Sequence, residues 1–182
     1  MRLDNELVNR KLFDTRNKAQ NAIKEGIIKV DDKVITKSSY EVSDESKIEI
    51  AGEVMPYVSR GGLKLEKAIN VWNVDLKNKT MLDIGSSTGG FTDCALQNGA
   101  KKVIAVDVGS DQMDKKLRDD SRVDLHENTD FRTLDKGLLD EADFASIDVS
   151  FISVTKIIDV FKTLENLKEV VCLVKPQFEC GI

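Results

Sequence analysis

The chain has 182 residues, 41% of them hydrophobic and 32% charged, with 11 Gly and 2 Pro, which excludes collagen-like, Pro-rich and wholly disordered proteins. Its longest apolar run, Val170 to Val174, is far shorter than the roughly 20 residues that span a bilayer. The charged start is unlike a signal peptide, and three cysteines without metal-ligand spacing indicate free thiols and no metal site. We therefore expect a cytoplasmic globular protein that does not insert into membranes.

The charges are unevenly distributed along the chain. Residues 1 to 40 contain nine Lys or Arg against six Asp or Glu, and residues 56 to 79 contain five against two. Residues 80 to 182 contain twelve against nineteen. The N-terminal part is therefore the candidate surface for a polyanion, although solvated lysines on an ordinary surface would give the same count.

The first 50 residues predict a small α+β module. Leu3, Leu7 and Val8 repeat at helical spacing, and Asp14-Thr15 starts a second helix that ends at Gly26. Short strands are expected at residues 28 to 30, from residue 34, and at residues 48 to 50. We assign this module to residues 1–54.

From residue 57 onward the pattern is α/β. A helix with Leu65, Ala68, Ile69 and Trp72 on one face is followed by repeated strand-helix units. The expected strands are residues 80–84, 102–107, 123–126, 143–149 and 170–175, with helices near 91–98, 112–119 and 154–166. This alternation predicts a parallel, Rossmann-like sheet covered by helices in residues 57–182.

The strongest chemical signal is a Gly-rich turn between a strand and a helix. It comprises Asp83, Gly85, Ser86, Ser87, Thr88, Gly89, Gly90 and Phe91. Small residues let the backbone approach a ligand, and the N–H groups of the next helix can bind polar groups. The turn lacks the Lys-Ser/Thr of a phosphate-binding loop and the G-x-G-x-x-G spacing of dinucleotide enzymes, and a tight structural turn remains the alternative.

An acid at the end of the next strand supports a nucleoside cofactor. Asp107, followed by Val108, stands 22 residues after Gly85, where a carboxylate can accept the ribose hydroxyls of an adenosine group. A strand-end cap is the structural alternative. Together the two acids and the Gly-rich turn favour S-adenosylmethionine over a nicotinamide cofactor.

Five motifs in this order resemble the TlyA family, also called hemolysin A. They are Tyr57 to Lys64, Asp83 to Thr92, Ala105 to Gly109, Asp148 to Ser153, and Leu173 to Glu179. Residues 2 to 50 resemble the ribosomal protein S4-like RNA-binding domain. The resemblance implies an S-adenosylmethionine-dependent rRNA ribose 2′-O-methyltransferase with an FtsJ-like class I methyltransferase domain and ribosomal subunits as partners.

The family resemblance also implies the catalytic groups. Its Lys-Asp-Lys-Glu tetrad maps onto Lys64, Asp148 and Lys175 for the first three members. A lysine held near a carboxylate can orient a ribose hydroxyl and take its proton during in-line methyl transfer. A solvated helix lysine, a strand-end cap and an edge charge are the respective structural alternatives.

The fourth acid of the tetrad has no counterpart among the 182 residues, and the resemblance implies a further helix and two further strands. We therefore expect a longer parent protein. Relative to this parent, the chain should be less stable, should self-associate through an exposed edge of its fifth strand, and should transfer little or no methyl.

Two further sets of binding residues are predicted. Asp130 is expected to face the adenine and accept its amino group, with an ordinary loop Asp as the alternative. Arg2, Arg10, Arg16 and Lys18 are expected to form one basic face that binds RNA phosphates. His126, the only histidine, is expected to cap or pack at its strand.

Two other functions compete with methyl transfer. The chain could act as an RNA-binding fragment without catalysis, or as a membrane-active hemolysin. The second alternative is weak, because no basic amphipathic helix is evident and aromatic residues make up only 5% of the chain.

Overall fold

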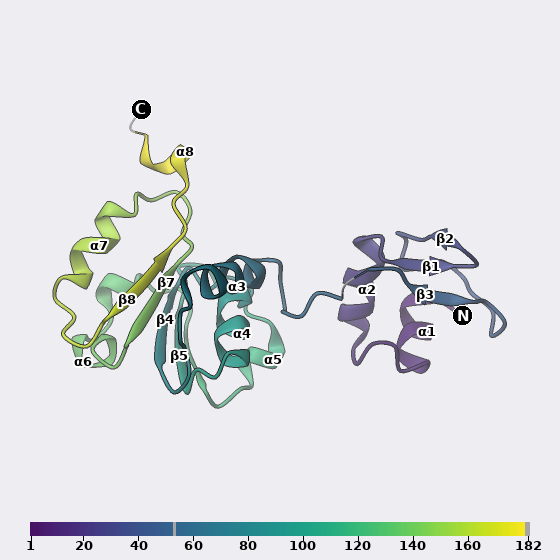
Figure 1. Cartoon of the computed structure of the whole chain (residues 1–182), viewed down its shortest axis with the longest axis horizontal. Helices are drawn as coiled ribbons and strands as arrows, with labels where there is room; N and C mark the ends of the chain where they lie inside the picture. The colour runs from purple at the N-terminus through teal and green to yellow at the C-terminus, as the bar shows by residue number, and fades with distance from the viewer. Residues whose placement is uncertain (53, 181–182) are drawn as a thin grey trace. The chain divides into compact units, whose positions relative to one another are not determined.

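The computed structural model describes residues 1–52 and 54–180, which form two compact units, Met1–Pro56 and Tyr57–Ile182. Figure 1 shows the elements of both units along the chain. Each unit has its own hydrophobic core, so each is described by itself.

The first unit packs two helices against a three-stranded antiparallel sheet. Helices α1 (Leu3–Asn9) and α2 (Arg16–Lys24) precede β1 (Ile28–Val30), β2 (Lys33–Val34) and β3 (Ile48–Ile50), and the sheet order is β2-β1-β3. Thr15 is the N-cap of helix α2, and its Oγ1 accepts a hydrogen bond from Lys18 N at 3.3 Å. Leu3, Leu7 and Ile23 are fully buried in its core, as their helical spacing predicts.

The second unit contains a five-stranded parallel sheet. Its elements are α3 (Gly61–Trp72), β4 (Thr80–Ile84), α4 (Gly90–Gln97), β5 (Lys102–Val106), α5 (Lys115–Arg118), β6 (Val123–His126), a 3-10 turn (Phe131–Thr133), α6 (Lys136–Leu139), β7 (Phe144–Ile147), α7 (Thr155–Phe161), β8 (Glu169–Cys172) and α8 (Pro176–Glu179). The strand order is β6-β5-β4-β7-β8. The chain therefore runs outward from β4 in both directions, which creates a topological switch point beside β4.

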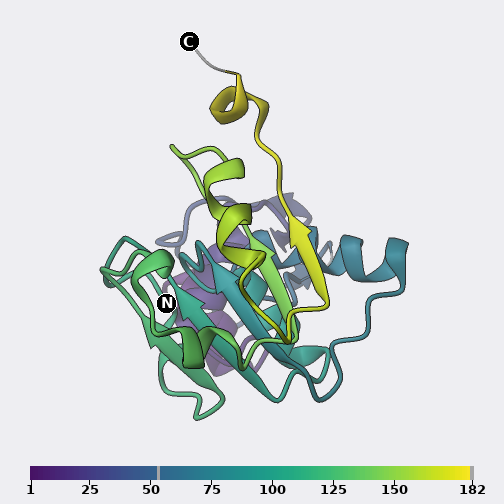
Figure 2. The same ribbon diagram turned by 90° about the vertical axis from the view of Figure 1, so that its left-hand side faces the viewer.

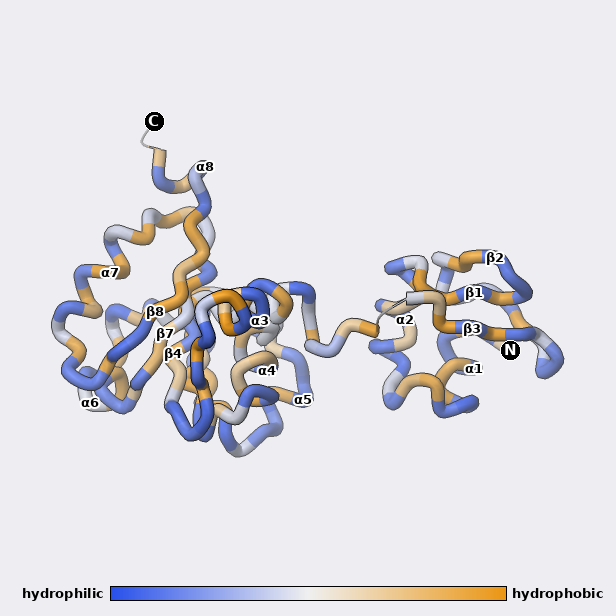
Figure 3. Tube along the Cα trace, in the orientation of Figure 1, coloured by the Kyte–Doolittle hydropathy of each residue, from blue (hydrophilic) through white to orange (hydrophobic). Residues whose placement is uncertain are grey.

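Both faces of the sheet are buried at its central strands β4, β5 and β7. Met81 of β4 faces a core formed with α3, α4 and α5, whereas Leu82 faces a core formed with α6 and α7. The strands consequently appear as hydrophobic stretches in Figure 3, and the view in Figure 2 shows the sheet with helices around it. Within the first of these cores, Cys94 of α4 is fully buried, and burial raises the pKa of its thiol to about 11.

Several predicted boundaries differ from the structure. The strands expected at 143–149 and 170–175 end at Ile147 and Cys172, and the helix expected at 154–166 ends at Phe161. Trp72 shares the predicted apolar face of its helix with buried Leu65, but its own side chain is 67% exposed. Trp72 is the last residue of α3, and it lines an apolar groove together with Val171 and Cys172 of β8.

Candidate functional site

The Gly-rich turn after β4 lies against the segment that follows β7. Gly85 has a φ of +81°, and a Cβ atom there would collide with the carbonyl oxygen of Asp148. Glycine is therefore required at this position by both conformation and space. This close packing brings Asp148 to the Gly-rich turn at the carboxyl edge of the sheet.

A cavity of about 420 Å³ opens at the carboxyl ends of β4, β5 and β7. Its size lies within the range of about 300 to 1,000 Å³ typical of small-molecule sites. Its wall contains five of the predicted cofactor residues, namely Gly85, Ser87, Asp107, Val108 and Asp130, together with Asp148. Apolar wall is supplied by Phe131, Ile152 and Ile157.

A smaller cavity of about 110 Å³ shares Gly85, Ser87 and Asp148 with the large one. The predicted residues Ser86, Thr88, Gly90 and Phe91 line it, together with Ser59 and Gly61. The two cavities therefore form one crevice around the Gly-rich turn. Gly89 lines neither cavity and packs instead against Met113 and Leu117.

Asp83 was predicted to contact the cofactor, but the structure places its carboxylate inside the protein. It is fully buried and accepts hydrogen bonds from Thr92 Oγ1 at 2.7 Å and Ser146 Oγ at 2.9 Å. Burial is the main cause that raises its pKa, to about 6, and the two hydroxyl groups partly oppose this effect. Asp83 therefore links β4, α4 and β7 beneath the crevice and does not line it.

Asp107 lies at the cavity wall and organises two loops. Its Oδ2 accepts a hydrogen bond from Ser87 N at 2.7 Å, and its Oδ1 accepts one from Gly109 N at 2.7 Å. Ser87 has a φ of 48°, a left-handed conformation uncommon for serine. Since a carboxylate has about four lone-pair sites, both oxygens can still accept ligand hydroxyls.

Asp130 also lies at the wall, but its carboxylate already has a cationic partner. Both of its oxygens contact the guanidinium of Arg132, with Nε at 2.9 Å from Oδ1 and 3.0 Å from Oδ2. The Arg132 side-chain hydrogen bond is the main cause that lowers the pKa of Asp130. The wall at this point is thus an Asp-Arg pair.

Lys64, Asp148 and Lys175 come together from three elements. Lys64 Nζ lies 3.4 Å from Asp148 Oδ2, and Lys175 Nζ lies 2.6 Å from Asp148 Oδ1. Lys175 Nζ also donates to Ser150 Oγ at 3.0 Å. The three residues are separated by up to 111 positions in sequence, from 64 to 175, yet they form one cluster that opens onto the crevice through Asp148.

Phe151 is a site residue whose role the sequence did not predict. It lines the large cavity, is 91% exposed and has a φ of +65°, which is strained for a bulky residue. Its ring lies 5.3 Å from the ring of Phe178, centroid to centroid. The only signal in the sequence was its place three residues after Asp148.

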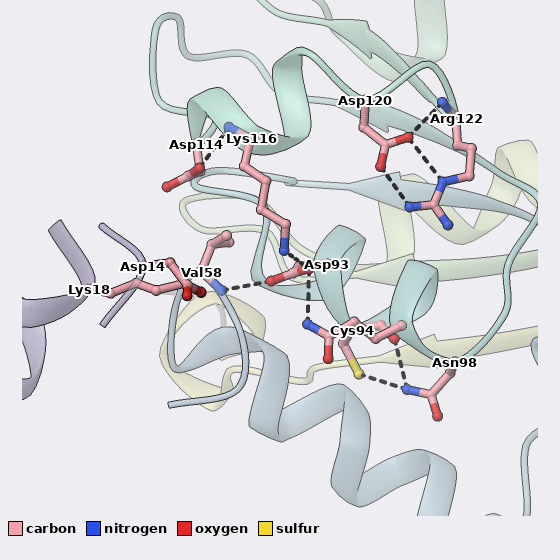
Figure 4. Close-up of polar contacts among 11 residues, drawn as sticks. Asp14, Lys18, Val58, Asp93, Cys94, Asn98, Asp114, Lys116, Asp120 and Arg122 are labelled. Carbon is pink, nitrogen blue, oxygen red and sulfur yellow. Dashed lines mark hydrogen bonds and ion pairs between the residues drawn. The ribbon is translucent and has the colours of Figure 1, made fainter. Parts of the chain in front are cut away.

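The segment before α3 is fixed to α4 by a buried carboxylate. Asp93 Oδ2 accepts a hydrogen bond from Val58 N at 2.9 Å, and its Oδ1 lies 3.3 Å from Lys116 Nζ. These contacts are visible in Figure 4. They hold the segment that leads into α3, and hence the start of the helix that carries Lys64.

The four predicted RNA-binding cations in the first unit have different surroundings. Arg2 and Arg16 both bind the fully buried Asp4, at 3.0 and 2.9 Å, while their own side chains remain about half exposed. The hydrogen bond from Arg2 is the main cause that holds the pKa of Asp4 well below its usual range. Lys18 forms an exposed ion pair with Asp14 at 3.1 Å.

Arg10 differs from the other three cations because its contacts are internal. Its guanidinium lies 2.7 Å from Glu6 Oε1 and donates to the carbonyl oxygens of Ser43, Asp44 and Ser46. These bonds join α1 to the loop before β3. Arg10 therefore has a structural role in this fold, which its basic character alone did not indicate.

A parallel sheet with this strand order, a Gly-rich turn after its first strand and an acid at the end of its second strand defines a nucleotide-cofactor-binding α/β domain. Comparison with known families agrees. Residues 57–182 match the FtsJ-like methyltransferase family, and residues 1–48 match the S4 domain.

The similar proteins include a Bacillus subtilis protein described as the rRNA methyltransferase YqxC, 49% identical over 99% of this chain and 65% of its own length. Hemolysin A of Brachyspira hyodysenteriae is 44% identical over 98% of this chain and 75% of its own length. A solved structure from Streptococcus thermophilus, described as a hemolysin, is 43% identical in sequence and has a TM-score of 0.69. The match covers 100% of this chain and 68% of the Streptococcus thermophilus chain.

The 16S/23S rRNA (cytidine-2′-O)-methyltransferase TlyA of Mycobacterium tuberculosis is 36% identical over 99% of this chain and 68% of its own length. The chain thus spans about two thirds to three quarters of these relatives. It belongs to the FtsJ-like methyltransferase family, in the TlyA and hemolysin A branch that also carries an S4 domain.

Proposed function

We propose that this protein is an S-adenosylmethionine-dependent methyltransferase that modifies a ribose 2′-hydroxyl group of rRNA. The observation that carries the proposal is the convergence of Lys64 and Lys175 on Asp148, whose carboxylate lies at the wall of the crevice. The name of the relative from Mycobacterium tuberculosis, a (cytidine-2′-O)-methyltransferase, supports the same chemistry.

The residues of the crevice fit this cofactor. Asp107 offers carboxylate oxygens to the ribose hydroxyls, and the wall of Val108, Phe131, Ile152 and Ile157 suits the flat, weakly polar adenine ring. The smaller cavity at the start of α4 fits the amino-acid end. When bound, S-adenosylmethionine supplies an electrophilic methyl group on sulfur.

The lysine-aspartate cluster would handle the proton. Transfer of the methyl group to a ribose 2′-oxygen would require the hydroxyl to give up its proton. The amine of Lys64 or Lys175 would take this proton at Nζ, and Asp148 would stabilise the ammonium group that results. Because Lys175 and Lys64 bind different oxygens of Asp148, one lysine can act as base while the other orients the hydroxyl.

Two features would bind the RNA. Phe151, exposed at the cavity mouth beside this cluster, offers a ring on which a base can stack. In the first unit, Arg2 and Arg16 present half-exposed guanidinium groups to phosphates, held in place by Asp4. No helix in residues 1–52 and 54–180 is long and apolar enough to cross a membrane.

The proposal is tested by incubating the protein with ribosomal subunits and methyl-labelled S-adenosylmethionine. Nuclease digestion and mass spectrometry should then show label in a 2′-O-methylated nucleoside. Label on a base instead of a ribose would overturn the assignment. Tight rRNA binding without any transfer would favour the RNA-binding function without catalysis.

A further inference from the structure

The loop after β5 brings a second polar side chain to the wall beside Asp107. Gln112 lines the large cavity, and its Oε1 accepts a hydrogen bond from Ser87 Oγ at 3.2 Å. Ser87 N also donates to Asp107 Oδ2 at 2.7 Å. Ser87, in the Gly-rich turn, therefore links Gln112 and Asp107, which both lie in the segment after β5.

The orientation of the Gln112 amide follows from its neighbours. Since the Ser87 hydroxyl donates to Oε1, the Nε2 group remains as the donor end. This nitrogen lies against the α-carbon of Gly109, where a Cβ atom would collide with it. Gly109 N in turn donates to Asp107 Oδ1 at 2.7 Å. An amide donor and a carboxylate acceptor are thus held side by side at the wall.

Glu127 fixes the loop that carries Gln112. Its Oε1 accepts a hydrogen bond from Gln112 N at 3.2 Å, and its Oε2 lies 3.0 Å from Arg118 Nη2. Burial would raise the pKa of Glu127, but the backbone N–H groups of the loop and Arg118 together lower it. On the other side, Asp114 N donates to Thr88 O at 3.1 Å. The loop is therefore bound at two points.

The hydroxyl groups of a ribose diol can use both a hydrogen-bond acceptor and a hydrogen-bond donor. Each hydroxyl donates one hydrogen bond and can accept others, whereas a carboxylate only accepts. Asp107 can satisfy the two hydroxyl protons but leaves the hydroxyl lone pairs without a donor. The Nε2 group of Gln112, next to Asp107, supplies that donor.

We propose that Gln112 is a second ribose-binding residue, which donates to a hydroxyl that Asp107 accepts from, and that Glu127 is the positioning residue for it. The inference rests on the proposed function, because the diol is that of S-adenosylmethionine or its product. It extends that function by assigning the recognition of the cofactor ribose to a pair of residues.

Calorimetry with S-adenosylhomocysteine and with its 2′-deoxy and 3′-deoxy analogues tests the pair. Gln112→Ala should weaken binding of S-adenosylhomocysteine about 3- to 10-fold, the value of one hydrogen bond. The same substitution should have little effect on whichever deoxy analogue lacks the contacted hydroxyl. Asp111→Asn, in the same loop with a 94% exposed side chain, is the matched control and should bind as the unaltered protein does.

The role of Glu127 is tested by comparing single and double variants of Glu127 and Gln112. Glu127→Ala should weaken binding by a similar factor, and the double variant with Gln112→Ala should be no weaker than either single variant. Glu127→Gln, which keeps one acceptor for Gln112 N, should restore part of the affinity. A double variant with multiplied losses would show that Glu127 does not act through Gln112. Thermal unfolding of each variant checks that the fold is retained.

The outcomes separate this inference from the proposed function. If the unaltered protein does not bind S-adenosylhomocysteine, both are overturned. If it binds but Gln112→Ala binds all three compounds as tightly as before, only the role of Gln112 is overturned. An equal loss for all three compounds would also overturn it, since the effect would then not involve a ribose hydroxyl.

Discussion

The Nζ atom of Lys175 lies 2.6 Å from Oδ1 of Asp148, and this short contact leaves Oδ2 to a second cation. Lys64 occupies that side at 3.4 Å. One carboxylate therefore holds two amines that would otherwise repel each other. The three groups should act as a unit, and removing any one should disturb the other two.

Lys64→Met and Lys175→Met should each reduce methyl transfer at least about 100-fold, the usual contribution of a proton-transfer group. Binding of S-adenosylhomocysteine should change little, because neither lysine lines the large cavity. The matched control is Lys67→Met, three residues along the same helix. Transfer by either variant at the control rate would remove the lysines from the mechanism.

Asp107→Ala should weaken S-adenosylhomocysteine binding by roughly 1.5 to 3 kcal/mol, because it removes charge-assisted bonds to the ribose. The structure gives a second reason for weaker binding, because Ser87 N and Gly109 N would both lose the carboxylate that accepts their hydrogen bonds. Calorimetry measures the loss. Unchanged affinity would show that the ribose binds elsewhere.

Asp83 should make the free energy of unfolding depend on pH. Its folded pKa of about 6 lies above the usual value of 3.8. The folded state therefore binds the proton more tightly, and stability should fall as pH rises from about 4 to 6, by on the order of 3 kcal/mol in all. Asp83→Asn should lose this dependence in urea unfolding between pH 4.5 and 7.5. An equally steep fall in the variant would assign the effect to another group.

Strand and helix order could be predicted from the sequence because the signals were local. Leu82 and Ile104 lie in short apolar runs, and Thr15 is a typical helix start. The exposure of Trp72 was not predicted, because helical periodicity defines an apolar face but does not show which of its residues other elements cover. Helices α6 and α8 were not predicted from the sequence, and at four residues each they span barely one helical turn.

The candidate site was predictable only in part, for a similar reason. The family motifs identified Lys64, Asp148 and Lys175, and the structure brings them together. Whether a polar side chain faces the crevice or the core depends on packing between distant segments, so the burial of Asp83 was not foreseen. The role of Arg10 was hidden too, because the carbonyl groups it binds lie over 30 residues away.

The basic residues of the first unit should make the affinity for rRNA depend on salt concentration. Neutralising Arg16 and Lys18 together as Gln should weaken rRNA binding and reduce the slope of log affinity against log salt by about 1.4, if each binds one phosphate. Filter-binding titrations at two or more salt concentrations measure the slope. An unchanged slope would show that these residues do not contact phosphates.

Arg10→Ala should instead destabilise the first unit by about 2 kcal/mol, because it leaves nearly buried Glu6 without its cation and frees the loop at residues 43–46. Denaturant unfolding measures the change. If the variant and the unaltered protein are equally stable, Arg10 has no structural role and remains a candidate RNA-binding residue.

The edge of β8 should promote self-association. Among the described residues β8 pairs only with β7, and Val170 within β8 and Val174 just after it are exposed. Val170→Lys should shift the mass measured by light scattering towards the monomer. A monomeric unaltered protein at high concentration would contradict this expectation.

The rate at which the Cys94 thiol is alkylated can report local opening of the larger unit. Its thiol is fully buried in the core beneath α4, and its raised pKa keeps it protonated at neutral pH. An alkylating reagent should therefore modify Cys180, which is exposed, at once, and Cys94 only during moments when α4 separates from the sheet. The rate of the slow reaction, followed by mass spectrometry with and without S-adenosylhomocysteine, would measure how strongly a ligand at the Gly-rich turn holds the helix that begins there.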